Sequence, residues 1–133
     1  MATLNDPEVR KLLEEPNYAV VSTVNQDGSI HSTVIWANAE KGHVAINSAL
    51  GRHWPTNLQR NPNVTLLIYE SGNPYNFVEI RGQATASTED ADPHIDALAK
   101  KYTGHDEYPY RRPGEQRVKF TIEPTRIRHV KQR

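Results

Sequence analysis

One short segment of this sequence combines side chains that together could bind an anion and a flat ring. It runs from Asn47 to Trp54 and includes Ser48, Arg52 and His53, between a strand-like stretch and a helix-like one. Free backbone N–H groups and the helix dipole favour anions at a helix N-terminus, and an arginine can hold a phosphate through two hydrogen bonds. Trp54 offers a flat face to a ring. On composition alone, a solvated helix cap with one packed tryptophan explains the segment equally well.

Most other kinds of chemical site find no support in the sequence. Its six histidines form no helical pair with an intervening glutamate, and no acidic cluster has the spacing of a calcium loop. His31 and His43 fall on strands across an expected hairpin and could meet, although polar faces of half-exposed strands explain them better. There is no cysteine, no nucleophile elbow and no glycine-rich phosphate-binding motif. We predict no metal, hydrolase or Rossmann site and identify no catalytic residue.

The composition limits the class of protein. Sixteen basic residues balance sixteen acidic ones over 133 residues, which argues against a nucleic-acid or membrane-surface binder. The apolar content of 36% is low for a self-sufficient domain, so we expect either loose surface segments or burial against a partner subunit. Residues 1–10 are polar and no stretch reaches the length of a membrane span. We expect a single domain over residues 1–133 of a soluble, cytoplasmic protein.

Three helices are predicted. Asp6 is expected to cap the first, with Pro7 in its first position, and Pro16 ends it. The second covers residues 51–60, with Leu58 as its main apolar anchor. Asp92 and Pro93 repeat the cap-and-proline pattern before the third.

Alternation and β-branched residues predict about seven strands joined mostly by tight turns. The second tight turn is expected at residues 40–42, and residues 73–74 and 103–115 are expected to be loops. The segment 64–69 is apolar enough to be a strand buried on both faces. The predicted strands are 18–25, 30–39, 43–48, 64–69, 77–87, 117–122 and 125–130, the last two separated by Pro124. The sheet should be antiparallel, and closing it into a barrel would remove exposed edges.

Several stretches resemble the pyridoxamine 5′-phosphate oxidase-like split β-barrel proteins. The segment STVNQDGSIH at 22–31 resembles their opening hairpin, residues 51–64 continue the likeness, and VEIRGQA at 78–84 resembles the strand that follows. The matching stretch covers about residues 17–86 in the expected order. The subgroup that this chain is most similar to uses the deazaflavin coenzyme F420.

The resemblance implies a mainly β (α+β) fold, a six-to-seven-stranded antiparallel split β-barrel of the FMN-binding type with about three short helices. It also implies a homodimer with cofactor sites at the subunit interface, a small-molecule substrate, and no nucleic-acid or membrane partner. Near the cofactor's phosphodiester it implies Asn47, Ser48, Arg52, His53, Trp54 and Asn57. Along its ring it implies Ser32, Thr33, Val34 and Trp36, with Tyr75, Asn76 and Phe77 from the opposite subunit.

The chain departs from the family's FMN-using oxidases at the phosphate. Those enzymes hold the phosphate with several Arg and Lys side chains, whereas this chain has His31, Trp36, His53 and Trp54 at the corresponding places. Many F420 binders keep a lysine near the helix start, where this chain has Trp54 or a neighbouring residue instead. Arg52 is therefore the main cation of this segment. The resemblance therefore favours F420 over FMN, because a dianionic phosphate without cations is poorly compensated.

The implied activity is that of an F420-dependent reductase. Reduced F420 gives a hydride to an electron-poor substrate such as an enone, quinone or imine, and Tyr110 is a candidate proton donor. The alternatives are an FMN-binding oxidoreductase of the same family and a non-catalytic F420 carrier.

Overall fold

Residues 2–132 are described in a computed structural model, and they form one seven-stranded antiparallel sheet with three helices. The strands are β1 (Ala19–Val24), β2 (Ile30–Ile35), β3 (Ala37–Glu40), β4 (His43–Ala49), β5 (Asn63–Glu70), β6 (Asn73–Ser87) and β7 (Arg117–Lys131). The helices are α1 (Pro7–Glu14), α2 (His53–Arg60) and α3 (Ala91–Thr103). The predicted mainly β fold is confirmed.

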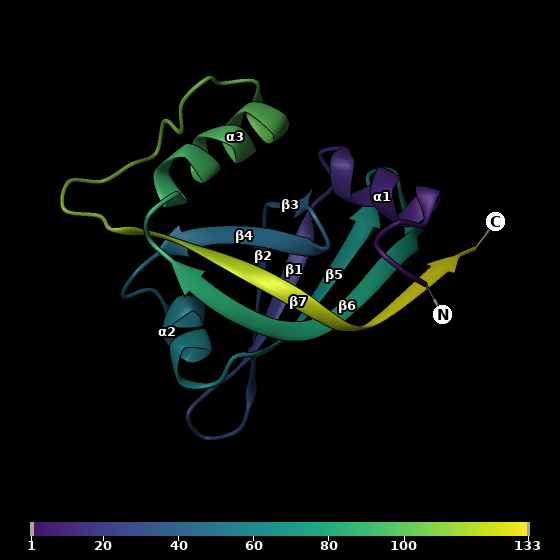
Figure 1. The fold of residues 1–133 in the computed structure, drawn as a ribbon, viewed down its shortest axis with the longest axis horizontal. Coiled ribbons are helices and arrows are strands. Elements are labelled where there is room, and N and C mark those ends of the chain that lie inside the picture. Colours follow the sequence, from purple (N-terminus) through teal and green to yellow (C-terminus); the bar gives the residue numbers. More distant parts are fainter. Residues whose placement is uncertain (1, 133) are drawn as a thin grey trace.

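The sheet curls until its two edges lie close together (Figure 1). The strand order is β2-β1-β5-β6-β7-β4-β3, so β2 and β3 are the outermost strands. Only Trp36 separates them in the chain. A single residue can bridge opposite edges only when the sheet has bent round on itself, which confirms the split barrel. The predicted strand 30–39 is therefore two strands. Before Trp36 the chain pairs with β1, as β2, and after Trp36 it pairs with β4, as β3.

The longest strands, β6 and β7, are both curved and run side by side (Figure 1). They pair along nearly their whole length, with a register shift between Arg81 and Gly82, and Gly82 lies opposite Pro124. Proline lacks an N–H, so it is tolerated at such an irregularity. The prediction of two strands around Pro124 was wrong for this reason.

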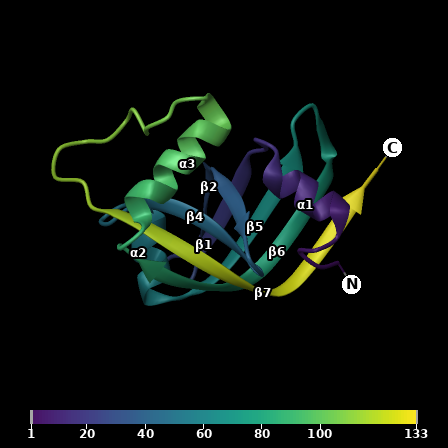
Figure 2. The same ribbon diagram turned by 45° about the horizontal axis from the view of Figure 1, so that its top comes forward.

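The inner side of the curl holds the core. Leu12 and Leu13 of α1 and Phe120 of β7 are among the largest fully buried side chains. Figure 2 shows α1 over β5 and β6, and α3 over β4. The prediction that β5 is buried on both faces was wrong. Leu66 and Ile68 point inward and are buried, whereas alternate residues such as Leu67 and Tyr69 are half exposed on the outer face.

Local signals near the helix ends were partly misread. Asp6 makes no side-chain cap to α1 and instead accepts a hydrogen bond from the backbone N–H of Thr3 at 2.9 Å. The N-cap of α3 is Asp90, so Asp92 and Pro93 lie inside its first turn. Strand β6 begins at Asn73, where a loop was predicted. No helix in the described part of the chain is long and apolar enough to cross a membrane.

Candidate functional site

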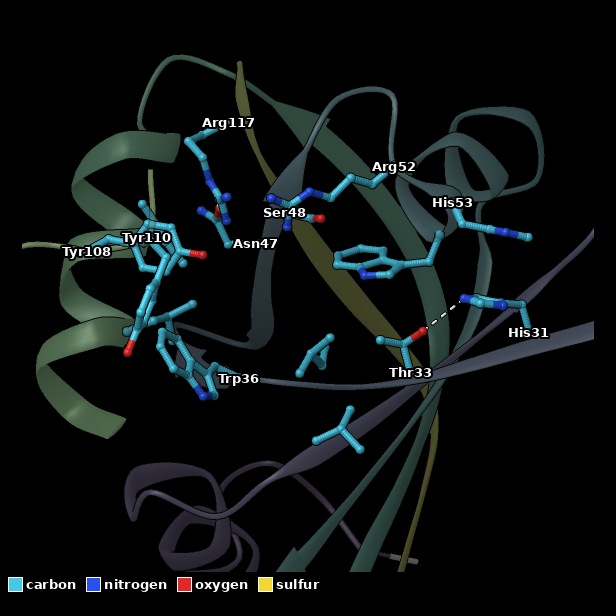
Figure 3. A pocket seen from close by; sticks show the side chains of 15 residues that line it. His31, Thr33, Trp36, Asn47, Ser48, Arg52, His53, Tyr108, Tyr110 and Arg117 are labelled. Carbon is cyan, nitrogen blue, oxygen red and sulfur yellow. Dashed lines mark hydrogen bonds between the residues drawn. The ribbon is translucent and has the colours of Figure 1, made fainter. Parts of the chain in front are cut away.

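A cavity of about 420 Å³ opens between β2, β4, the start of α2, α3 and the loop that follows α3 (Figure 3). The side chains that line it are His31, Thr33, Val34, Ile35, Trp36, Asn47, Ser48, Arg52, His53, Trp54, Ile95, Leu98, Tyr108, Tyr110 and Arg117. Eight of the predicted site residues are among them: Thr33, Val34, Trp36, Asn47, Ser48, Arg52, His53 and Trp54. The strand-to-helix segment singled out from the sequence therefore forms one wall of a real cavity.

The other predicted site residues lie elsewhere. Ser32 alternates to the outer face of β2, where its hydroxyl is 2.8 Å from that of Ser22. Asn57 lines an adjoining cavity of about 590 Å³, which shares His53 with the first. Tyr75 and Phe77 lie at the start of β6 and do not line the cavity of their own chain.

The cavity's positive charge comes from two arginines that share one carboxylate. Glu115 contacts Arg52 at 3.2 Å through one oxygen and Arg117 at 2.8 Å through the other. The side chains of Arg117 and Glu115 are only 3% and 6% exposed, whereas that of Arg52 is 45% exposed. Two positive charges and one negative charge leave this cluster with a net charge of +1.

Asn47 fixes the position of Arg117. Its side-chain oxygen accepts hydrogen bonds from Nε and Nη2 of Arg117 at 3.0 and 2.9 Å. Its side-chain nitrogen donates to the backbone oxygen of Ala91 at 2.9 Å and to Nδ1 of His94 at 3.0 Å. Every hydrogen-bonding direction of this buried amide is engaged, so the amide cannot rotate without losing bonds.

His94 supports this arrangement as a neutral ring. Its Nε2 donates to the side-chain oxygen of Asn38 at 2.8 Å, which leaves Nδ1 free to accept from Asn47. Burial lowers the pKa of His94 to about 4, and the positive charge of Lys119 acts in the same direction. The ring therefore stays neutral at physiological pH, as its acceptor role requires.

Two histidines stack at the opposite end of the cavity. The rings of His31 and His53 are parallel, with centroids 4.0 Å apart. Nε2 of His53 donates to the side-chain oxygen of Asn25 at 2.7 Å, and that oxygen also accepts from Asn57 at 2.9 Å. His31 does not pair with His43, which instead contacts Glu40 across its own turn. Both histidines are half-exposed strand residues, in agreement with the preferred prediction. No metal-binding cluster occurs among the described residues.

Aromatic rings form the end of the cavity nearest α3. Trp36 stacks on Tyr102 at 5.3 Å and meets Tyr108 edge-on at 6.2 Å, and Tyr108 meets Tyr110 at 5.7 Å. The loop carrying both tyrosines is tied to α3, because Asp96 accepts a hydrogen bond from the backbone N–H of Tyr108 at 2.8 Å. The same carboxylate pairs with Arg111 at 2.9 Å.

Trp54 offers little of its ring to the cavity, although the sequence predicted that its flat face would be available to a ligand ring. It is 5% exposed and packs against Phe120, with ring centroids 5.5 Å apart. Most of this ring therefore belongs to the core.

Sequence reasoning missed Arg117, Tyr108 and the apolar pair Ile95 and Leu98. Arg117 begins an alternating strand, and Ile95 and Leu98 fit the buried face of a helix, so neither pattern indicates a cavity. The one available signal was three closely spaced tyrosines: Tyr102 near the end of α3, and Tyr108 and Tyr110 in the otherwise polar loop that follows.

Comparison with known proteins matches the whole barrel. A family model described as Pyridoxamine 5′-phosphate oxidase matches residues 6–131. Among solved structures, an F420 reductase is 24% identical with a TM-score of 0.77, covering 90% of this chain and 94% of that chain. A conserved hypothetical protein from Mycobacterium tuberculosis is 20% identical with a TM-score of 0.75, covering 96% and 84%.

A candidate pyridoxamine 5′-phosphate oxidase from Listeria innocua is 23% identical with a TM-score of 0.69, covering 92% of this chain and 94% of that chain. At these identities the structural likeness establishes a shared fold. A comparison with curated protein sequences finds no match.

Proposed function

The chain belongs to the pyridoxamine 5′-phosphate oxidase family, and on that premise we propose that it is a cytoplasmic, F420-dependent oxidoreductase that reduces electron-poor organic molecules. Its fold is that of flavin- and deazaflavin-type oxidoreductases. The choice of F420 over FMN rests on the charge of the cavity.

The choice of F420 over FMN depends on the carboxylate of Glu115, which pairs with both Arg52 and Arg117. Arg52, Glu115 and Arg117 together offer a net charge of +1. The phosphate of FMN is a monoester with a charge of about −1.5 to −2 at neutral pH, whereas the phosphodiester of F420 carries a single negative charge. A single net positive charge balances the diester and leaves the monoester undercompensated.

The adjoining cavity gives the remainder of F420 a place to lie. It is lined by polar groups at the start of α2 and in the turn after β1, and it includes Arg60 and Asn57. His53 lines both cavities. F420 is longer than FMN and ends in carboxylates, so a ring in the first cavity and a tail along the second would use both.

The residues of the cavity position the reactants and exclude water. When bound, reduced F420 supplies the hydride. Thr33 and Trp36 would lie along its ring, Arg52 and Ser48 beside its phosphodiester, and the apolar side chains of Ile95 and Leu98 keep the far wall dry. Holding both reactants in one orientation in a dry site accounts for catalysis without an acid–base pair.

We expect the protein to bind oxidised F420 at least about tenfold more tightly than FMN, and Arg52→Ala to weaken F420 binding by about tenfold. Arg52 is partly exposed, so its loss should leave the fold intact. Arg10→Ala is the control, because Arg10 pairs with Glu14 on the surface of α1. Fluorescence titrations measure both affinities. Tighter binding of FMN would make the protein a flavin oxidoreductase instead.

Turnover separates an enzyme from a carrier. Reduced F420 should be oxidised when enones, quinones or nitro compounds are added with the protein. Tight binding with no oxidation across that panel would identify a non-catalytic F420 carrier.

The outer face of the sheet suggests how two subunits associate. Val34 of β2 lies beside Val20 of β1, which lies beside Leu67 of β5. Val34 is 60% exposed, and Ile30 on the same face is 63% exposed. Ser22 and Ser32 pair between these apolar side chains, and an exposed sheet face that mixes apolar and small polar residues is typical of a protein interface. We propose that it joins two copies of the chain, with Tyr75 and Phe77 of each subunit near the other's cavity.

Asn76 is a less suitable interface residue than its neighbours. It is buried, donates to Glu70 at 3.1 Å and lies 2.8 Å from His129. Tyr75, by contrast, is 63% exposed and available to a partner.

Ile30→Lys should raise the dimer dissociation constant by at least about tenfold, because it places a charge in the proposed interface at a residue that does not line the 420 Å³ cavity. Thr88→Lys adds the same charge at an exposed position before α3 and should leave the dimer intact. Light scattering after size-exclusion chromatography measures the mass of each variant. A wild-type protein that is monomeric at all concentrations would refute the dimer.

A further inference from the structure

The aromatic end of the cavity has a shape suited to a flat ligand. Trp36, Tyr108 and Tyr110 come from two distant parts of the chain and meet there (Figure 3). Tyr102 holds Trp36 from behind by stacking, and its own hydroxyl donates to the backbone oxygen of Asn17 at 2.6 Å. Aromatic faces fixed in this way favour stacking by planar, conjugated molecules.

Arg117 places unused hydrogen-bond donors at this same end. A guanidinium has five N–H groups. Three of those in Arg117 are engaged by Asn47 and Glu115. Within the described residues no partner is found for the remaining two, and the guanidinium lies 4.9 Å from the centre of the Tyr108 ring.

The donors of Arg117 are held rigidly in a water-poor place. Its side chain is 3% exposed, and the amide of Asn47 that orients it is itself fixed by His94 and Ala91. Fixed donors in a site of low dielectric stabilise developing negative charge strongly, because they need no reorganisation when the charge forms.

We propose that Arg117 is a catalytic residue that stabilises the oxyanion formed when a planar conjugated carbonyl compound, an enone or a quinone, is reduced between Tyr108, Tyr110 and Trp36. This inference rests on the proposed function. With reduced F420 bound as the hydride and two-electron donor, a hydride would add to the β-carbon of the substrate and the electron pair of the C=C bond would move toward the carbonyl. The carbonyl oxygen would then become an enolate oxygen that accepts hydrogen bonds from Arg117, and a proton from water would reach the α-carbon.

The charge of the site favours this substrate class over imines. An imine becomes a good hydride acceptor when it is protonated, and a buried guanidinium repels that cation. A neutral carbonyl compound adds no charge on binding, so it is compatible with a phosphodiester already balanced by the net +1 of the arginine cluster.

The oxyanion site can be tested without cofactor or turnover. 4-Nitrophenol is planar, carries one oxygen that changes from neutral to anionic, and reports its ionisation by absorbance. Bound to the wild-type protein, it should ionise about one pH unit lower than in solution, which corresponds to a tenfold preference for the phenolate. Equal affinity for the phenol and the phenolate would overturn the proposal.

Three variants locate the effect. Arg117→Lys keeps the charge but loses the planar donors, and it should reduce the preference to about threefold or less. Arg112→Lys makes the same change at an exposed site in the loop before β7 and should leave the preference unchanged. Tyr110 is 62% exposed, so Tyr110→Ala should fold normally and weaken binding of both forms while keeping their ratio.

The outcomes separate this inference from the proposed function. A full phenolate preference in Arg117→Lys, or unchanged binding in Tyr110→Ala, would overturn the inference even if F420 binds tightly. Failure of F420 and FMN to bind would remove the proposed function whatever the behaviour of the phenolate.

Discussion

Replacing Gly82 with alanine should lower the free energy of unfolding by more than about 3 kcal/mol. A Cβ atom at this position would overlap the backbone oxygen of Glu123 and would lie 2.9 Å from Cγ2 of Ile122. The oxygen belongs to the backbone of β7, so it cannot turn away as the end of a flexible side chain could. Relief of the clash requires β6 and β7 to separate where they bend together around Pro124.

Urea unfolding followed by circular dichroism measures this loss. Gly28→Ala is the control, because Gly28 has a φ of 89° but no atom within 4 Å of its added Cβ. That variant should lose only about 1 kcal/mol, the cost of a left-handed backbone conformation for a residue with a Cβ. Equal losses in the two variants would show that the close approach at Gly82 is not what fixes the bend.

The protein should lose about 3 kcal/mol of stability as the pH falls from about 6.5 to about 4, because of His94. Burial, followed by the charge of Lys119, lowers the pKa of this ring to about 4 from an ordinary value of 6.5. Above pH 6.5 the ring is neutral in both the folded and the unfolded chain, so its contribution does not vary. Between the two values the unfolded chain takes up a proton that the folded chain excludes, and unfolding becomes easier.

Protonation of His94 also disturbs the cavity. A protonated Nδ1 cannot accept from Asn47, and the amide of Asn47 holds Arg117. Low pH should therefore loosen the guanidinium before the barrel unfolds.

Other charged groups that face His94 do not produce this slope over most of the range. Burial acts to raise the pKa of Glu40, but hydrogen bonds from Lys119 and His43 lower it overall. A hydrogen bond from Lys119 lowers the pKa of Asp90. Both carboxylates therefore lose their charge only toward the acid end of the window.

Urea midpoints at several pH values from 7.5 to 4.5, compared with His94→Gln, test the prediction. A glutamine can accept from Asn47 and donate to Asn38 as the neutral histidine does, but it does not titrate. The variant should therefore show a much flatter stability profile. Parallel profiles for the two proteins would assign the acid sensitivity to other groups.

The sequence by itself determined the local elements and the family. Proline and apolar spacing located α1, and alternating β-branched residues located most strands, because these signals depend on residues a few positions apart. The order of the matching stretches likewise indicated the split barrel and the segment from Asn47 to Trp54, and the structure confirmed that this segment lines a cavity.

Only the tertiary structure decided what the cavity can bind. Arg117 reaches Asn47 across 70 positions because β7 pairs with β4, and Glu115 reaches Arg52 across 63. Tyr108 and Tyr110 face Trp36 because the loop is tied to α3 while the edges of the sheet meet at Trp36. The spacing of residues in the sequence does not predict such contacts, because they depend on which strands become neighbours when the sheet curls.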